Sequence, residues 1–341
     1  MIYIDGIVFS LQQHGGISVY FHELYSRLVA ANAKAKLLIH EKSELNVTLS
    51  SLDNKQGLVQ KKSRPLERYM RSDVDSDCVF HSSYYRIPSL TVPTVTTVHD
   101  FTYEKLVSGP RKWVHVWQKN ESIKKSDVVI CISNNTAKDL MQYCKVEESK
   151  IEIVYNGVSE CYRPLSDYDL TTEQVLFVGS RTGHKNFKIA AQAVSQCSFL
   201  ELTVIGGGGF TKREKAFLDE IMPGRYRHMG HLSNKQLNYM YNSSYCLLYP
   251  SSYEGFGIPI IEAMRAGCPV IAINASSIPE VAGEAALLVE RPDIRLLADA
   301  LKNLKIGRER ERLVRAGLEQ ANKFSWQKCF EETYRIYERL Q

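Results

Sequence analysis

The segment from residue 249 to 280, YPSSYEGFGIPIIEAMRAGCPVIAINASSIPE, restricts the possible folds of this chain more than any other part of its sequence. It begins at the end of an apolar run that is typical of a buried strand, and a glycine-containing turn leads from there into the apolar spacing of a helix. Pro259 suits the first helical position, where its missing N–H costs nothing, and Gly267 suits the position just after the helix. A second apolar run, PVIAI, follows. This order of strand, turn, helix and strand indicates an α/β fold.

The turn EGFG at residues 254–257 is predicted to bind an anion. Its two glycines let a ligand approach the main chain, and the following helix offers its first amide groups and the positive end of its dipole. A pyrophosphate fits such a site best. Glu254 lies in this turn and Glu262 in the first turns of the helix, so one ligand could meet both carboxylates. Taken alone, either glutamate would ordinarily be a solvated surface residue.

The complete motif resembles the signature of retaining glycosyltransferase family 4. It consists of E-G-F-G, four residues of apolar type, a second glutamate and A-M-x-A-G-x-P-V. The resemblance covers nearly the whole chain and is strongest in residues 181–186 and 251–280. It implies the GT-B fold, in which two Rossmann-like, doubly wound parallel-sheet α/β domains face a central cleft and a C-terminal helix crosses back to the first domain. The chain looks similar to bacterial mannosyltransferases of O-antigen and capsular polysaccharide synthesis.

Length and composition agree with two globular domains. A chain of 341 residues can bury two cores, and 44% hydrophobic and 24% charged residues are typical of soluble globular proteins. A polar run between residues 162 and 172 interrupts the α/β pattern. We therefore expect an acceptor-side domain at residues 1–165, a nucleotide-sugar-binding domain at 166–322, and a terminal helix at 323–341 that packs on the first domain.

Charge, termini and cysteines disfavour several classes of protein. A net charge of +5 is too mild to indicate nucleic-acid binding. The first residues are typical of a strand and not of a signal peptide, and no apolar run is long enough to span a bilayer. The eight cysteines show no C-x-x-C spacing, which favours reduced core thiols in a cytoplasmic protein and makes a cysteine metal site improbable.

Two cations are predicted to hold the phosphates of the donor. Arg181 and Lys185 follow a strand-like run at residues 174–180. A guanidinium can contact phosphate oxygens in pairs, and an ammonium adds a point charge. A basic surface loop is the alternative, but the family has an arginine and a lysine here with similar spacing. Together with the amide groups of residues 255–258, they would stabilise the negative charge that grows on the departing phosphate.

The resemblance implies further roles in the second domain. Glu262 would bind the ribose hydroxyls. Glu254 would bind sugar hydroxyls or stabilise the positive charge that develops on the sugar ring. Leu232 would lie in a loop beside the nucleobase.

In the first domain, the resemblance places Gly15 and Gly16, before a predicted helix, against the diphosphate. A simple turn is the alternative. His99 ends a strand, where ligands bind in open α/β sheets, and would position the donor sugar. The alternative is a structural histidine, and Asp100 would orient the loop or the imidazole. The expected catalytic residues are Glu254, His99, Arg181 and Lys185. The residues expected to contact the nucleotide sugar are Gly15, Gly16, Arg181, Lys185, Leu232, Glu254, Gly255, Phe256, Gly257, Ile258 and Glu262.

Two basic segments allow two interpretations. Residues 55–71 contain six lysines and arginines, which would ordinarily form a solvated face. Residues 111–126 carry Trp113, Val114, Trp117 and Ile123 and are predicted to form an amphipathic helix that packs on its own sheet. The alternative for both segments is contact with an anionic membrane, which would make the protein peripheral on the cytoplasmic face of the inner membrane.

Asp73 and Asp75 form a D-x-D motif, which holds a divalent metal in another class of glycosyltransferase. These aspartates precede the strand-like run at residues 78–81 instead of ending one. We therefore expect no metal and no cofactor apart from the donor substrate.

The sequence leaves the substrates open. We favour mannose from GDP-mannose and a saccharide or lipid-linked acceptor in surface polysaccharide synthesis. The alternatives are transfer of a hexose or rhamnose from a UDP- or dTDP-sugar, and a UDP-sugar 2-epimerase of similar shape. A non-catalytic carbohydrate-binding protein needs no pyrophosphate cradle, and a nicotinamide oxidoreductase is disfavoured because no strand leads into a complete G-x-G-x-x-G.

Overall fold

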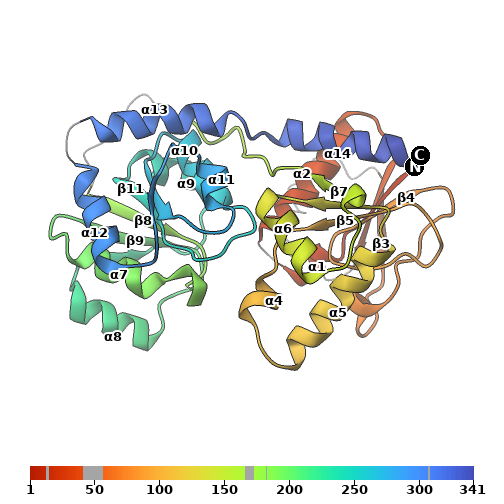
Figure 1. Cartoon of the computed structure of the whole chain (residues 1–341), viewed down its shortest axis with the longest axis horizontal. Helices are drawn as coiled ribbons and strands as arrows, with labels where there is room; N and C mark the ends of the chain where they lie inside the picture. The colour runs from red at the N-terminus through yellow and green to blue at the C-terminus, as the bar shows by residue number, and fades with distance from the viewer. Residues whose placement is uncertain (13–14, 41–56, 166–172, 182, 306–307) are drawn as a thin grey trace. The chain divides into compact units, whose positions relative to one another are not determined.

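The computed structural model describes residues 1–12, 15–40, 57–165, 173–181, 183–305 and 308–341. The chain forms two compact units (Figure 1): unit 1 contains residues 1–157 and 325–341, and unit 2 contains residues 158–324. Domain boundaries were expected after residues 165 and 322. The first of these was placed in the polar run at residues 162–172, of which residues 166–172 lie outside the described residues.

Unit 1 is built on a parallel sheet. Among its described residues the strand order is β3-β2-β1-β4-β5-β6-β7, and each pairing is parallel. The strands are β1 (Ile2–Asp5), β2 (Ala35–His40), β3 (Leu58–Lys61), β4 (Val79–Ser82), β5 (Thr94–Val98), β6 (Val128–Cys131) and β7 (Ile151–Ile153). The helices are α1 (Val8–Leu11), α2 (Gly16–Ala30), α4 (Thr102–Leu106), α5 (Pro110–Lys125), α6 (Asn134–Tyr143) and α14 (Trp326–Leu340), with short 3-10 helices η2 (Glu67–Tyr69) and η3 (Glu148–Lys150).

Unit 2 repeats this architecture. Its strand order is β10-β9-β8-β11-β12-β13, again with parallel pairings. The strands are β8 (Gln174–Val178), β9 (Glu201–Ile205), β10 (Tyr226–His228), β11 (Cys246–Tyr249), β12 (Val270–Ile273) and β13 (Leu287–Val289). The helices are α7 (Phe187–Ser195), α8 (Lys212–Ile221), α9 (Asn234–Asn242), α10 (Ile258–Arg265), α11 (Ile278–Ala282), α12 (Ile294–Asn303) and α13 (Glu309–Ala321), and η4 (Gly183–Lys185) is a 3-10 turn.

The predicted pair of doubly wound parallel sheets is confirmed. In each sheet the chain moves outward from a central strand and then continues on the other side of that strand. The order therefore reverses between β1 and β4 in unit 1 and between β8 and β11 in unit 2. In open α/β sheets, ligands bind beyond the carboxyl ends of the two strands at such a switch point. The loops that follow these four strands are consequently the places where a site is expected.

Local sequence signals fix several helix ends. The Thr136 amide donates to Ser133 Oγ (3.0 Å), and this bond caps the start of α6. α9 begins with a capping box in which Ser233 and Gln236 each accept a hydrogen bond from the other's backbone amide. These helices therefore begin at Asn134 and Asn234, as the sequence indicated.

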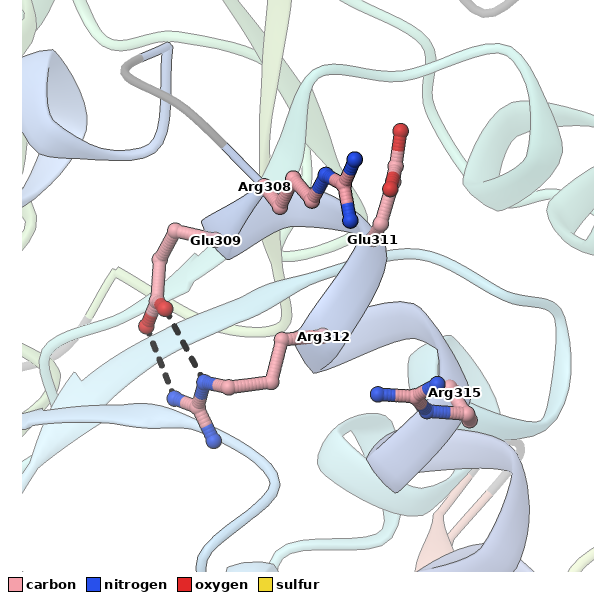
Figure 2. Close-up of a pocket in the computed structure, with 5 residues that line it drawn as sticks. All are labelled: Arg308, Glu309, Glu311, Arg312 and Arg315. Carbon is pink, nitrogen blue, oxygen red and sulfur yellow. Dashed lines mark hydrogen bonds and ion pairs between the residues drawn. The ribbon is translucent and has the colours of Figure 1, made fainter.

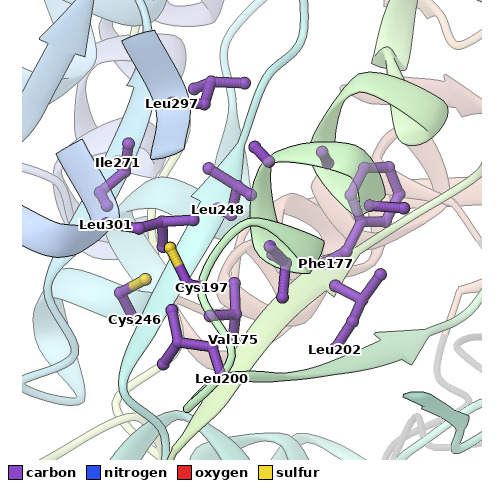
Figure 3. Packing of buried hydrophobic residues seen from close by; sticks show 14 of the residues in the cluster. Val175, Phe177, Cys197, Leu200, Leu202, Cys246, Leu248, Ile271, Leu297 and Leu301 are labelled. Carbon is purple, nitrogen blue, oxygen red and sulfur yellow. The ribbon is translucent and has the colours of Figure 1, made fainter. Parts of the chain in front are cut away.

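The core of unit 2 lies between its sheet and the covering helices (Figure 3). Val175, Leu202 and Leu248 extend from three neighbouring strands and belong to the same buried cluster as Leu297 and Leu301 of α12, and all five are fully buried. The eight cysteines are free thiols, and seven are buried, two of them in this cluster. They are core residues, as predicted.

α14 packs on α2 within unit 1. Its Tyr337 hydroxyl lies 2.5 Å from His81 Nδ1, and His81 Nε2 lies 2.8 Å from Thr97 Oγ1. Burial lowers the pKa of His81 to about 3, so this histidine is neutral and serves as a hydrogen-bonding link. At Gly157 a Cβ would stand 2.1 Å from the Trp326 amide nitrogen, so the chain that leaves β7 touches the start of α14.

α5 packs on its own sheet, as predicted: Ile123 is fully buried and Ser122 Oγ lies 3.0 Å from Thr96 Oγ1 of β5, but the tryptophans of the helix lie elsewhere. Trp113 and Trp117 are 73% and 61% exposed. The helix instead buries polar side chains, among them Lys119, whose ammonium pairs with Glu104 (3.1 Å) and donates to the Asp100 carbonyl (2.6 Å). Apolar spacing alone does not identify the side of α5 that faces the protein interior, because Lys119 is buried on that side together with its partner Glu104. Within the described residues, no helix has the length and apolarity needed to cross a membrane.

Candidate active site

Hydrogen bonds hold together the two loops at the β8/β11 switch point. The Asn186 side-chain amide donates to the Pro250 carbonyl (2.8 Å) and lies 2.6 Å from Ser252 Oγ. The Ser252 amide in turn donates to a carbonyl of the loop after β8 (2.8 Å). The fold thereby joins two parts of the predicted phosphate site that are 64 residues apart in the chain.

Lys185 and Glu254, both predicted catalytic residues, form an ion pair between these loops. The Lys185 ammonium also lies 5.5 Å from the centre of the Tyr249 ring. The two side chains are 18% and 13% exposed, so solvent reaches a pair that is otherwise well packed. A partly exposed ammonium at a switch point suits an anionic ligand, because phosphate oxygens can share it with the carboxylate or replace the carboxylate.

Two serines that the sequence analysis did not single out fix the turn at residues 254–257. Ser276 Oγ accepts a hydrogen bond from the Glu254 amide (2.8 Å). Ser277 Oγ lies 2.9 Å from the Glu254 carbonyl and 3.0 Å from the Phe256 carbonyl. Both serines follow β12, which pairs with β11. The two serines could have been predicted only from the order of the strands in the sheet. That order cannot be read from the sequence of the loop itself.

The start of α10 has the expected glycine geometry. Gly257 precedes the helix with a φ of 103°, a value that favours glycine, and a Cβ there would meet Ile260 Cδ1 at 3.2 Å. α10 begins at Ile258, Pro259 lies in its first turn, and Gly267 follows the helix with a φ of 78°. The first amide groups of a helix have no intrahelical acceptors, so α10 directs donors towards this turn.

Glu262 lies within α10 and contacts α9. The Tyr241 hydroxyl donates to Glu262 Oε2 (3.1 Å). Burial raises the pKa of Glu262 to about 7, and this hydrogen bond only partly opposes the increase. At a given pH the folded state therefore favours the protonated carboxyl more than a solvated glutamate does. Tyr241 is another neighbour of the predicted site that the sequence did not reveal.

Arg181 is held by groups of unit 2. Its Nε donates to Glu214 (2.8 Å), and the other N–H groups donate to Glu214 and to the carbonyls of Gly206, Gly208 and Gly209 over 2.8–3.4 Å. These bonds occupy all five guanidinium donors. The hydrogen bond from Arg181 lowers the pKa of Glu214 to about 2. The predicted contact of Arg181 with phosphate stays a prediction, while the observed contacts fix the glycine-rich loop.

The glycine-rich loop after β9 passes close to the end of β8. Gly206, Gly207 and Gly208 have φ values of 81°, 70° and 72°, a left-handed conformation that favours glycine. A Cβ on Gly207 would stand 2.8 Å from the Gly179 carbonyl oxygen. The glycines therefore provide room for the backbone beside the switch point.

Leu232, the predicted neighbour of the nucleobase, lines a mostly apolar hollow of about 400 Å³. The Gly206 amide donates to the Gly230 carbonyl (2.7 Å), so the loop before α9 is tied to the glycine-rich loop. Apolar walls with a few polar groups suit a planar ring. The other lining residues are Met229, Lys235, Gln236, Tyr239 and Met240.

His99 is buried at the end of β5 in unit 1. Its ring meets the Tyr20 ring edge-on, with centroids 5.2 Å apart, and its Nε2 is a buried atom without a hydrogen-bond partner in the described part of the chain. Burial lowers the pKa of His99 to about 4, so the imidazole is neutral at pH 7. The Asp100 carboxylate accepts from the Thr102 amide (2.9 Å) at the start of α4. Asp100 therefore organises the loop, one of its two expected roles.

Gly15 and Gly16 lie where α2 begins, next to residues 13–14, which lie outside the described part of the chain. The Gly15 carbonyl accepts hydrogen bonds from the Val19 amide (3.1 Å) and from Ser18 Oγ (2.8 Å). The structure thus assigns these glycines to the start of a helix, and their contact with a diphosphate stays a prediction.

A second hollow, of about 600 Å³, lies against α13 and contains none of the predicted site residues (Figure 2). In Figure 2, Glu309 and Arg312 face each other, and the Arg312 guanidinium donates both to Glu309 Oε1 (2.7 Å) and to Oε2 (2.9 Å). Its lining comes from one surface helix and not from strand ends. We therefore place the candidate site at the β8/β11 switch point.

The aspartates of the D-x-D motif have protein partners. Asp73 pairs with Lys61 (3.1 Å) and Asp75 pairs with Lys36 (2.7 Å). Lys61 lies on the edge strand β3, and Lys36 lies on its neighbour β2. The described residues contain no group of three or more histidines, cysteines or acids arranged to hold a metal.

Comparison with known proteins agrees with this geometry. The family model described as Glycosyl transferases group 1 matches residues 163–320, and the model described as Glycosyltransferase Family 4 matches residues 14–160. O-antigen chain mannosyltransferase B of Escherichia coli is 28% identical over 288 residues, which are 77% of this chain and 75% of that protein. O-antigen chain mannosyltransferase RfbU of Salmonella typhimurium is 29% identical over 66% of this chain and 64% of its own length.

Solved structures agree on the fold. Anabaena HepE in complex with UDP and glucose has a TM-score of 0.76 at 14% identity and covers 99% of both chains. Sucrose-phosphate synthase from Thermosynechococcus elongatus has a TM-score of 0.76 at 17% identity and covers 99% of this chain and 98% of its own. The two family models match the two halves of the chain, with the division between residues 160 and 163. The chain belongs to the family 4, group 1 glycosyltransferases and has the GT-B fold.

Proposed function

We propose that this protein is a retaining glycosyltransferase that transfers mannose from GDP-mannose to a saccharide or lipid-linked saccharide during surface polysaccharide synthesis. The observation that carries the proposal is the partly exposed Lys185–Glu254 pair at the β8/β11 switch point. Family membership supports sugar transfer, and the names of the two bacterial relatives support mannose.

In this proposal, Lys185 and the amide groups of residues 255–258 hold the diphosphate. As the bond between the sugar and the phosphate breaks, negative charge grows on the departing oxygen, and donors that are already oriented stabilise it most. The acceptor oxygen attacks the face from which the diphosphate leaves, so the anomeric configuration is retained. Glu254 then binds sugar hydroxyls or stabilises the positive charge on the ring.

Other residues position the donor. Glu262 accepts hydrogen bonds from the ribose, and Leu232 packs beside the base. Arg181 holds the glycine-rich loop, which follows from its five contacts. The unpaired Nε2 of His99 forms a hydrogen bond with a sugar hydroxyl, since a buried imidazole nitrogen gains from a partner.

We propose that catalysis needs no divalent metal. The ion pairs of Asp73 and Asp75 with lysines support this, because a metal at the D-x-D motif would have to displace them. Turnover should be unchanged in excess EDTA. A strict requirement for Mg²⁺ would contradict the proposal and favour the D-x-D motif.

The proposal is tested first by the thermal stability of the protein with GDP, UDP, dTDP and ADP. GDP should raise the melting temperature most, since a ligand that binds the folded state stabilises it. A larger effect of UDP or dTDP would favour transfer of another hexose or of rhamnose. Transfer from the matching sugar nucleotide should then give an α-linked product from an α-linked donor by NMR. Conversion of the donor without acceptor would instead indicate an epimerase.

A further inference from the structure

α5 leaves large apolar side chains in solvent although it has a sheet to pack on. Four of its five buried residues are polar, whereas Trp113, Val114 and Trp117 are exposed by 73%, 44% and 61%. Trp113 and Trp117 are four residues apart and therefore lie on the same side of the helix. We call these three residues the α5 outer face.

Buried polar contacts fix this orientation. The side chain of Lys119 is 1% exposed and pairs with Glu104 of α4. Gln118 Nε2 donates to the Arg68 carbonyl (2.7 Å). Rotating α5 to bury its tryptophans would leave Glu104 as an unpaired buried charge, which is strongly unfavourable. The exposure of the α5 outer face is therefore a built-in feature of unit 1.

Segments in contact with α5 expose further apolar side chains. Leu106 is exposed at the end of α4, the helix that supplies Glu104. Leu66, Tyr69 and Met70 are exposed in the segment around η2 that contacts Gln118 through Arg68. Leu66 is 73% exposed and has a φ of 60°, an unfavourable conformation for leucine that still directs its side chain to solvent.

Cations lie beside these apolar groups. Lys124 follows Trp117 by seven residues and so lies on the same side of α5, and Arg111, Lys125 and Arg71 are also exposed. Among the neighbouring acids, Glu104 pairs with Lys119 and Glu121 pairs with Lys124 at 3.5 Å, and Asp127, exposed just beyond α5, accepts a hydrogen bond from the Thr94 amide. The surface around the α5 outer face is therefore apolar at its centre and cationic at its ends.

We propose that the α5 outer face, with Leu66, Tyr69, Met70 and Leu106, docks on the surface of a bilayer that contains anionic lipids. Tryptophan prefers the headgroup region of a membrane, where its ring is apolar and its N–H stays hydrated. A helix with exposed tryptophans and flanking cations lies in that region parallel to the membrane plane. The cations add an electrostatic attraction to anionic lipids, which a small apolar surface needs in addition to its own burial for stable membrane binding.

The first test measures binding of the whole chain to vesicles of equal parts phosphatidylcholine and phosphatidylglycerol. The chain has three tryptophans, and Trp326, the first residue of α14, is 5% exposed, so a vesicle-dependent blue shift of tryptophan emission reports on the other two. We expect co-flotation and a blue shift with these vesicles, and weaker binding to phosphatidylcholine alone. Absence of binding to the anionic vesicles overturns the proposal.

The second test uses surface variants that leave the core intact. Trp113→Ala with Trp117→Ala should lower vesicle affinity by roughly tenfold or more and abolish the blue shift. Met141→Ala, which changes an exposed apolar residue of α6 in the same unit, should bind like the wild type. Equal vesicle binding by the double tryptophan variant overturns the proposal.

The third test separates a membrane from a protein partner. Arg111→Gln with Lys125→Gln should lower affinity for anionic vesicles about fivefold per charge, whereas Lys138→Gln with Lys145→Gln removes two exposed charges elsewhere in unit 1 and should change little. All four variants should keep the wild-type turnover with a water-soluble acceptor. Concentration-dependent self-association that the tryptophan changes abolish, without vesicle binding by the wild type, would assign this surface to a protein contact instead.

Discussion

Both units place a cation and a carboxylate together at their switch points, but the two pairs differ in burial. In unit 1, Arg86 pairs with Asp5, the last residue of β1, at 3.0 Å, and the side chains are 1% and 0% exposed. In unit 2, Lys185 pairs with Glu254, and the side chains are 18% and 13% exposed. The same fold therefore uses one pair to organise the protein and leaves the other within reach of a ligand.

The partners of Arg86 explain its structural role. Besides Asp5, its guanidinium donates to Glu67 (2.7 Å) and to the carbonyls of Met70 (3.0 Å) and Arg71 (3.2 Å). Burial raises the pKa of Asp5, which shows that the pair is costly to desolvate. Arg86 and Arg181 thus resemble each other, because each guanidinium ties a loop to the end of a strand. Of Arg86, Arg181 and Lys185, we assign phosphate binding to Lys185, because its ion pair with Glu254 is partly exposed to solvent.

Replacement of Arg86 should have the largest effect on stability. Arg86→Met leaves Asp5 buried without its cationic partner, which costs about 3–5 kcal/mol, whereas Glu67 keeps its ion pair with Arg64 at 2.8 Å. The midpoint of urea-induced unfolding should fall accordingly. Lys36→Met, which breaks the exposed pair with Asp75, is the control and should cost less than about 1 kcal/mol. Equal midpoints for Arg86→Met and the wild type would remove the distinction between the two pairs.

Replacement of Lys185 should affect catalysis instead. Lys185→Ala should lower kcat/KM about 10²–10³-fold, equivalent to about 3–4 kcal/mol, because a donor to the leaving group is lost. Its melting temperature should stay near that of the wild type. Lys188→Ala, an exposed lysine of α7 three residues away, is the matched control. Unchanged turnover in Lys185→Ala would refute the phosphate role.

Arg181 sharpens the comparison because its five contacts make it resemble Arg86 although it lies beside the site. Arg181→Ala should destabilise the protein by about 2 kcal/mol through the lost contacts with Glu214 and the glycine-rich loop. Arg181→Lys should not restore stability, since a lysine ammonium cannot donate the five hydrogen bonds that the planar guanidinium makes. Thermal unfolding and donor KM would be measured together. Loss of turnover with unchanged stability would favour direct phosphate contact.

The comparison also shows what could be read from the sequence. The starts of α6 and α9 were predictable because Ser133 and Ser233 act within a few residues. Lys185 and Glu254 were each predicted as site residues, but their ion pair was not predicted. The pair depends on the neighbouring positions of β8 and β11, and this strand order is a property of the whole sheet. The resemblance to the family supplied their roles.

The remaining features depend on long-range contacts. The inward face of α5 was predicted correctly at Ile123 but not at Lys119, because lysine is a surface residue by type and only the pairing of Lys119 with Glu104 explains its burial. The contacts of Arg181 with residues 206–214 and the serines at 276–277 required the same knowledge of neighbouring loops. Residue type and spacing do not carry that information.

A smaller effect is expected from the titration of Glu262. Its folded-state pKa of about 7 lies above the usual 4.5, so the folded state binds more protons between these values, and stability falls as pH rises through this window. Glu262→Gln removes this dependence. The melting temperature of the variant relative to the wild type should therefore increase from pH 5 to pH 8. A constant difference across this range would contradict a buried carboxyl at this position.

The most direct test of the central claim is a crystal structure of the protein with GDP. We predict that the diphosphate lies within about 3.2 Å of Lys185 Nζ and of amide nitrogens in residues 255–258. A diphosphate bound elsewhere, for example against Arg308 and Arg312 in the hollow on α13, would contradict the assignment of the site to the β8/β11 switch point.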